Sequence, residues 1–197
     1  RTDDLPVVGT QSTYLTGHDE IHSLSQILKI PTIRFWMGFG EHYINVFSVL
    51  KSLGLLSEQP VQLDSGQEVV PLQLVKAVLP DPASLAADYT GKTRIGTLLK
   101  GEKDGKAREV FLYNVCDHAE TYAEIGSQAI SYTAGVPAAA AALLIADGTW
   151  DVQRMVNVEE LPPLPLLRLQ AGMGLPTRVR EGTTDVALED APEAQDA

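Results

Sequence analysis

The densest group of chemically capable side chains lies in residues 114–118, which read NVCDH. This segment holds the only cysteine of the chain together with an amide, a carboxylate and an imidazole. An imidazole titrates near neutrality, so His118 has the chemistry of a proton shuttle. Asp117 has the chemistry to orient that imidazole, to cap a helix or to bind a cationic amine. Proton transfer and the binding of a polar substrate are therefore the reactions that this segment suits.

Two sharper interpretations of the same segment are disfavoured. A thiolate nucleophile at Cys116 needs a base in contact, and His118 lies two residues away on the same strand face. A zinc site needs about four ligands, and no further cysteine is present. A single cysteine is more often a small buried hydrophobe. Tyr113, Tyr122 and Tyr132 are likewise expected in the core or at an interface rather than in the chemistry.

A hairpin and a helix are the elements that must position these side chains. Residues 92–99 and 108–113 predict two strands joined by residues 100–106, with Asp104-Gly105 at the tip. The second strand ends at residues 114–118, where α/β proteins usually place their sites. A helix is expected to start at Asp117 or His118. We expect residues 135–137 to interrupt it, and residues 138–146 to form a second, buried helix that is too short to span a bilayer.

The remainder of the chain alternates helical and extended patterns, which favours an α/β class of the α+β type: a mixed sheet with helices packed on one face. The expected elements are an entering strand or linker over 1–13, a helix within 14–28, a strand at 31–40, a helix at 41–53, a hairpin at 61–70, helices at 71–79 and 83–87, an extended piece at 156–160, a helix at 165–171 and an edge strand at 176–180. Residues 181–197 are acidic and lack aromatic residues, so we expect a disordered tail there.

Three features of the first half have a plain reading beside a functional one. Gly38 and Gly40 follow a strand and precede a helix, but Tyr43 stands where a dinucleotide fingerprint needs its third glycine. A simple strand–turn–helix is therefore favoured. Arg34 and Trp36 share a strand face, and Arg34 suits either a substrate carboxylate or a structural ion pair. His18 and His22 lack the glutamate of a zinc motif, which favours a surface helix.

Composition limits the class of partner. The chain has 197 residues, with 15 Lys and Arg against 26 Asp and Glu, a net charge of −11. This acidity argues against nucleic-acid binding, and it gives weak support to a cationic substrate. One cysteine fits a reducing cytoplasm. No membrane or signal segment is expected near the start, and the first residue, Arg1, favours a processed or truncated chain.

Several motifs in order resemble one known family. They are IRFWMGFGEHY, VVPLQLVKAVLPDPASL, residues 91–150 from GKTRIGTLLKGEKDG to LLIADGTW, and NVEELPPLP. Residues 14–179 resemble the C-terminal portion of the carboxynorspermidine dehydrogenases, within the saccharopine dehydrogenase-like family. The resemblance implies that residues 14–180 form a substrate and dimerisation domain, and that an N-terminal Rossmann domain, absent from this chain, binds most of the NADP(H).

The resemblance also implies a chemistry and a set of site residues. The chemistry is an NADPH-dependent reductive condensation of aspartate β-semialdehyde with 1,3-diaminopropane or putrescine, a reaction of polyamine biosynthesis. Such a site needs a proton shuttle, an anchor for the substrate carboxylate and acids for the distal ammonium. His118 and Asp117 are the catalytic candidates. The substrate-binding candidates are Arg34, Trp36, Asn114, Cys116, Gln128, Tyr132 and Thr133.

Other functions stay open at this point. The same domain would serve a saccharopine dehydrogenase-type enzyme that acts on another amino-acid semialdehyde. It would also serve as a non-catalytic binding or assembly module that kept the fold without the reaction. For the enzyme, we expect small-molecule substrates, a cytoplasmic homodimer, no metal, and no activity of this chain alone.

Overall fold

The computed structural model describes residues 1–191, apart from the side chain of residue 83. The described chain divides into two compact units, one of residues 1–21 and 32–85 and the other of residues 22–31 and those from 86 onward. Strand pairing follows the same division, because β1 to β5 pair only among themselves within the described residues. The expectation that residues 14–180 form one domain stays a prediction.

The first unit contains small antiparallel sheets and two helices. Its elements are β1 (Thr2–Leu5), β2 (Gly9–Thr16), β3 (Phe35–Gly38), α2 (Glu41–Ser52), β4 (Val61–Gln62), β5 (Glu68–Val69) and α3 (Pro71–Val78), with most of the 3-10 turn at Pro82–Asp88. The helices and hairpin predicted for residues 41–79 are confirmed. Helix α1 (Asp19–Ile27) begins in this unit and ends in the other.

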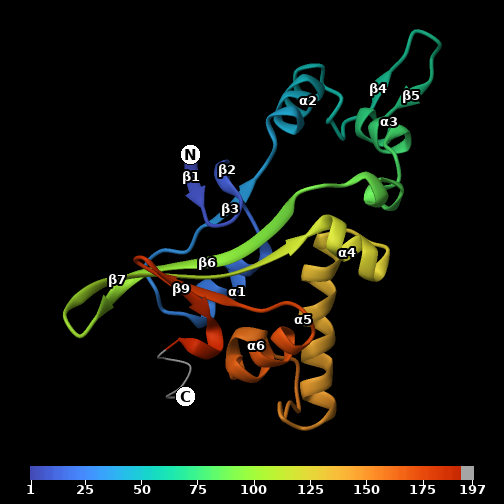
Figure 1. Cartoon of the computed structure of the whole chain (residues 1–197). Coiled ribbons are helices and arrows are strands. Elements are labelled where there is room, and N and C mark those ends of the chain that lie inside the picture. The colour runs from blue at the N-terminus through green and yellow to red at the C-terminus, as the bar shows by residue number, and fades with distance from the viewer. Residues whose placement is uncertain (192–197) are drawn as a thin grey trace. The chain divides into compact units, whose positions relative to one another are not determined.

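The second unit is organised by a four-stranded antiparallel sheet in the order β6–β7–β8–β9. Its elements are β6 (Lys92–Lys103), β7 (Lys106–Asp117), α4 (His118–Ile125), α5 (Ala129–Ala146), a 3-10 turn at Val158–Glu160, α6 (Pro163–Gly172), β8 (Arg178–Glu181), β9 (Thr184–Ala187) and a 3-10 turn at Leu188–Asp190. Figure 1 shows the long β6–β7 hairpin, with α4 at the end of β7 and α5 running beside α6.

The β6–β7 hairpin confirms the turn prediction. Asp104 and Gly105 both have positive φ, 55° and 73°, as a two-residue hairpin turn of the primed type requires. The register is fixed from Lys103 opposite Lys106 to Lys92 opposite Asp117. Both strands are longer than the sequence pattern indicated, because every residue from Lys92 to Lys103 pairs with one from Lys106 to Asp117.

The helix that follows β7 breaks earlier than expected. We predicted an interruption at residues 135–137, but the break lies at Gly126, which caps α4 in the left-handed conformation with φ of 64°. Helix α5 then continues through Pro137. Glycine adopts the left-handed conformation without a steric penalty, whereas one proline removes a single hydrogen bond that tertiary packing can offset. The prediction weighted the proline too heavily.

The segment after β8 is ordered, contrary to the expected tail. Strand β9 and the turn at Leu188–Asp190 occupy residues 184–190, so β8 is an inner strand and β9 is the edge. The Tyr113 hydroxyl donates to Asp185 at 2.6 Å, and the Arg178 guanidinium donates to the same carboxylate at 2.8 Å. Leu188 is buried on the opposite face. Residues 192–197 of the predicted tail lie outside the described residues.

The α/β class is confirmed, although the sheets differ from the single mixed sheet that was expected, because every pairing among the described strands is antiparallel. Alternate residues of β7 face the helices. Cys116 packs with Ala129 and Tyr132 of α5, and Val179 and Val186 pack with α6 at the other end. The sheet of the second unit therefore holds two helices on one face, and the candidate site lies where β7 runs into α4.

Helix α5 corrects a second expectation. Its 18 residues are long and apolar enough to cross a membrane by length and composition, and α5 is the one such helix in residues 1–191. The sequence had suggested a helix too short for that. Ala140 and Leu144 are buried, as expected of a packing helix, but Ile130 and Leu143 are about half exposed.

Candidate functional site

A cavity of about 430 Å³ opens where β7 ends. It is within the size range of small-molecule sites. Four elements of the second unit surround it: the end of β7, helix α4, the first turn of α5 and the turn after α6. The lining residues are Val115, Cys116, Asp117, Glu120, Thr121, Glu124, Tyr132, Gly172, Met173 and Gly174.

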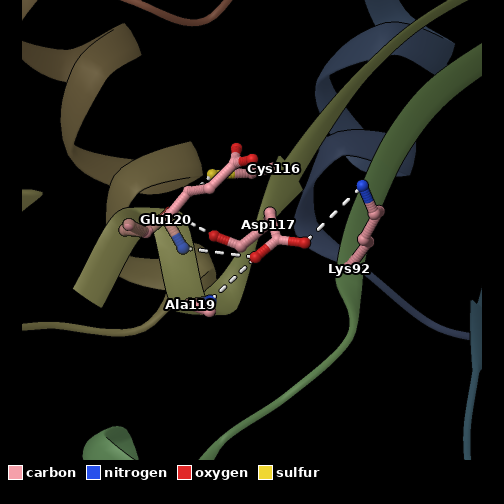
Figure 2. A network of polar contacts seen from close by, with 6 residues as sticks. Lys92, Cys116, Asp117, Ala119 and Glu120 are labelled. Carbon is pink, nitrogen blue, oxygen red and sulfur yellow. Dashed lines mark hydrogen bonds and ion pairs between the residues drawn. The ribbon is translucent and has the colours of Figure 1, made fainter. Parts of the chain in front are cut away.

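Asp117 is the N-cap of α4, as predicted. Its Oδ1 accepts hydrogen bonds from the backbone N–H groups of Ala119 at 2.9 Å and Glu120 at 3.2 Å. Its Oδ2 lies 3.5 Å from the Nζ of Lys92, on the neighbouring strand. Figure 2 shows this arrangement between β6 and the start of α4. The backbone N–H of Glu120, with lesser help from Ala119 and Lys92, holds the pKa of Asp117 below its ordinary value.

Cys116 forms a buried contact with the hydroxyl of Thr121, at 3.0 Å. The Thr121 hydroxyl also donates to the Asp117 carbonyl at 2.7 Å. Since that hydroxyl has only one proton, the contact with Cys116 is made by the thiol as donor. Within residues 1–191, no hydrogen bond joins the side chains of Cys116 and His118. The geometry therefore does not support a thiolate that this histidine activates.

Tyr132 closes the far wall of the cavity. Its hydroxyl donates to the Met173 carbonyl at 2.7 Å and lies 3.3 Å from a carboxylate oxygen of Glu124. Burial and the nearby Glu124 raise the pKa of Tyr132. Gly174 has φ of 87°, and a Cβ there would collide with the Tyr132 hydroxyl. The turn after α6 can therefore approach the tyrosine only with glycine at this position.

The cavity is electrostatically one-sided. Its lining side chains include the carboxylates of Asp117, Glu120 and Glu124 and no lysine, arginine or histidine. Lys92 compensates Asp117 from outside the lining. Carboxylates with a hydroxyl and a thiol beside them suit a ligand that carries positive charge and donates hydrogen bonds.

His118 lies next to this cavity but does not line it. The side chain is buried, with Nδ1 accepting the Ala129 backbone N–H at 3.2 Å and Nε2 lying 3.4 Å from the Thr93 hydroxyl. The ring of Tyr89 packs against its edge. An accepting Nδ1 places the imidazole proton on Nε2. His118 thus joins the starts of α4 and α5, and its catalytic role stays a prediction.

Three other predicted contacts lie near the cavity without lining it. Asn114 faces the helices from β7, and its side-chain oxygen is buried without a hydrogen-bond partner in the described structure. Gln128 precedes α5 as its N-cap residue, without a side-chain cap bond. Thr133 is buried and donates to the Ile130 carbonyl within α5. Of the predicted residues, Cys116, Asp117 and Tyr132 are the ones that line the cavity.

Arg34 and Trp36 belong to the first unit. Arg34 is exposed and immediately precedes β3. Trp36 lies within β3, opposite Leu15, and the Arg1 guanidinium stacks on its ring at 3.9 Å from the centroid. Their part in a substrate site stays a prediction.

Sequence reasoning missed three lining side chains of α4 as site residues: Glu120, Thr121 and Glu124. The two glutamates had been interpreted only as favourable for the helix dipole. Their spacing of four residues puts both carboxylates on one helix face, which was the available signal. No local signal indicated Met173, because its place beside Tyr132 depends on the packing of α6 against α5.

The Gly38–Gly40 turn does not fit a dinucleotide fingerprint. A dinucleotide fingerprint needs a parallel strand–helix–strand unit, but β3 pairs antiparallel with β2. The backbone at Gly40 is extended, with φ of −64° and ψ of 149°, and no Cβ at Gly40 would meet another atom within 4 Å. This turn therefore shows no tight cradle that needs glycine. In residues 1–191, no group of three or more His, Cys, Asp or Glu is arranged to hold a metal ion.

Comparison with known families and proteins gives concordant matches. The model of the saccharopine dehydrogenase C-terminal domain matches residues 2–175. A carboxynorspermidine synthase of Vibrio cholerae is 47% identical over 178 residues, 90% of this chain and 43% of that protein. The corresponding Vibrio alginolyticus protein is 46% identical with the same coverage.

A third relative has a different product name. The carboxyaminopropylagmatine dehydrogenase of Synechocystis is 49% identical over 174 residues, 87% of this chain and 43% of that protein. The chain therefore spans less than half the length of the curated relatives that it matches.

Proposed function

The chain belongs to the saccharopine dehydrogenase C-terminal domain family, and from this we propose that it is the substrate-binding portion of a nicotinamide-dependent dehydrogenase of polyamine biosynthesis. The complete enzyme joins aspartate β-semialdehyde to an aliphatic amine, 1,3-diaminopropane or putrescine, and reduces the product with loss of water. The products are carboxynorspermidine or carboxyspermidine.

One observation carries this proposal: 46% to 49% identity to three relatives over about nine tenths of the chain. Two of them are named for carboxynorspermidine and the third for carboxyaminopropylagmatine. These names share a carboxylated aminopropyl group joined to an amine and differ in that amine. The acid-lined cavity beside α4 supports the same reading, because every such amine is cationic at neutral pH.

In this proposal the described residues bind and orient the substrates. The α4 cavity takes the amine, and Arg34 anchors the carboxylate of the semialdehyde through a bidentate pair. His118 stays our proposed proton shuttle, with Asp117 beside it. NADP(H) supplies the reducing equivalent and binds mainly to an N-terminal Rossmann domain outside this chain; the poor fit of the Gly38–Gly40 turn to a dinucleotide fingerprint supports this part of the proposal.

The proposal includes a cytoplasmic homodimer. Large apolar side chains on α5, such as Ile130, Leu143 and Ile145, are about half exposed. A surface of this kind is typical of a segment that packs against further protein. We propose that the nucleotide-binding portion covers it in the complete enzyme, and that the chain alone is inactive.

The test is a choice of substrate pairs for the complete enzyme. NADPH oxidation should require aspartate semialdehyde together with a diamine. Oxidation with aminoadipate semialdehyde and glutamate instead would assign a saccharopine dehydrogenase-type reaction. A complete protein that oxidises NADPH with neither pair of substrates, and that binds a protein partner, would instead be a non-catalytic module.

A further inference from the structure

The α4 cavity holds three carboxylates, and they are not equivalent. Resting on the proposed function, we propose that Glu120 and Glu124 are the specificity-determining residues that bind the cationic end of the amine substrate. Tyr132 acts as a positioning residue for Glu124. The chemistry they recognise is a protonated aliphatic amine or a guanidinium on a short methylene chain.

Asp117 is already committed to other partners. One oxygen accepts two backbone N–H groups, and the other faces Lys92. A carboxylate engaged in this way stabilises the helix start and has little remaining capacity for a ligand. The first of the three carboxylates therefore belongs to the fold.

Glu120 and Glu124 differ from Asp117 in their partners. They lie one helical turn apart on α4, and both line the cavity. Neither carboxylate forms an ion pair among the described residues, and an oxygen of the Glu124 carboxylate lies 3.3 Å from the Tyr132 hydroxyl. Figure 2 shows the Glu120 side chain extending to the side of Cys116, another lining residue. Two uncompensated carboxylates facing one cavity favour a cation between them.

The rest of the lining suits the remainder of such a ligand. Val115, Gly172 and Met173 present apolar surface, which a methylene chain can contact. A site with acidic groups beside apolar surface recognises an alkyl amine by both its charge and its chain.

Tyr132 limits the conformations available to Glu124. The single hydroxyl proton is shared between the Met173 carbonyl at 2.7 Å and that carboxylate at 3.3 Å, and the ring is held against Cys116 and Leu175 in the core. A rigid neighbour reduces the entropy that Glu124 loses when it binds a ligand. Tyr132→Phe should therefore weaken amine binding less than the loss of the carboxylate itself.

The experiment uses the complete enzyme and four variants: Glu120→Gln, Glu124→Gln, Tyr132→Phe and the control Glu109→Gln. Glu109 is an exposed carboxylate of β7 that pairs with Lys100 and does not line the cavity. Initial rates are measured with 1,3-diaminopropane, putrescine and agmatine in separate arms. Calorimetry measures the binding of the same amines without turnover, and thermal unfolding checks that each variant is folded.

We expect the KM for the amine to rise about tenfold or more in Glu120→Gln and Glu124→Gln, with kcat and the KM for the semialdehyde nearly unchanged. Tyr132→Phe should raise the amine KM about threefold, and Glu109→Gln should match the wild type. The preferred arm identifies the cation as an ammonium or a guanidinium. A folded Glu120→Gln or Glu124→Gln enzyme with wild-type amine affinity by calorimetry would overturn the inference.

The two proposals fail separately. If the wild type oxidises NADPH with none of the amines, the proposed function is wrong. Loss of calorimetric amine binding in the two glutamate variants would then still support the cation site.

Discussion

The neighbouring residues Asp117 and His118 show that a residue's chemical capacity and its actual partners are separate questions. Both have side chains suited to proton transfer, and both are engaged in holding helix starts together. Asp117 caps α4, and the His118 imidazole accepts the first backbone N–H of α5. A buried imidazole whose two ring nitrogens both lie beside protein partners contributes first of all to the stability of the fold.

His118→Ala should destabilise the protein by about 1–3 kcal/mol, because the buried Ala129 N–H would lose its acceptor. The thermal unfolding midpoint measures this loss, and the pH profile of kcat tests the shuttle. Because His118 is the proposed shuttle, we also expect a kcat at least about tenfold lower and a missing limb in that profile. A folded variant with wild-type kcat would remove His118 from the mechanism.

For individual residues, the sequence predicted part of the site. Cys116, Asp117 and Tyr132 were predicted and do line the cavity. Glu120 and Glu124 were not chosen, because acidic residues early in a helix have an ordinary explanation in the helix dipole. Only the fold shows that their face looks into a cavity and that Met173 approaches from the other side.

Among the elements, the junction of β7 with α4 positions the site. The register places Lys92 opposite Asp117, so β6 supplies the cation that faces the helix cap. Gly126 then ends α4 and lets α5 turn back toward the strand. Local patterns predicted the hairpin and the capped helix start. The break at Gly126 and the ordered β9 depended on tertiary contacts, such as the bonds of Asp185 with Tyr113 and Arg178.

Acid should weaken this junction. The folded-state pKa of Asp117 is lowered, so its contribution is fully present above the ordinary aspartate value of about 3.9 and is lost as the pH falls through the folded value. The thermal unfolding midpoint of the complete protein should therefore decrease as the pH is lowered below about 4. The thermal unfolding midpoint of Asp117→Asn should decrease less steeply in acid than that of the wild type.

The matched control for that series is Asp64→Asn, at an exposed aspartate between β4 and β5 of the first unit. Its acid curve should run parallel to the wild-type curve. If Asp117→Asn also ran parallel to the wild type, the carboxylate would have no special part in the junction.

For the whole molecule, we propose that the substrate site and the cofactor site lie in different parts of the protein. The second unit contains an acid-lined cavity, and in the first unit the strand before the Gly38–Gly40 turn pairs antiparallel, unlike the parallel strand of a dinucleotide fingerprint. The sequence predicted the class and the family, since an ordered series of motifs is specific. It did not predict the division into two units, because the pairing of β1 to β5 among themselves is not encoded in local patterns.

A titration of the 197-residue chain with NADPH tests whether the cofactor site lies outside this chain. Circular dichroism first establishes that the isolated chain is folded. We expect no change in nucleotide fluorescence up to millimolar cofactor, because the nucleotide site is proposed to lie elsewhere. Micromolar binding would mean that the Gly38–Gly40 turn, or another described segment, holds the cofactor.

The most direct test of the central claim is a crystal structure of the complete protein soaked with 1,3-diaminopropane. The account predicts density for the diamine in the cavity between β7, α4 and the turn after α6, with one ammonium within hydrogen-bond distance of the Glu120 and Glu124 carboxylates. Diamine bound elsewhere, with this cavity filled only by water, would contradict it.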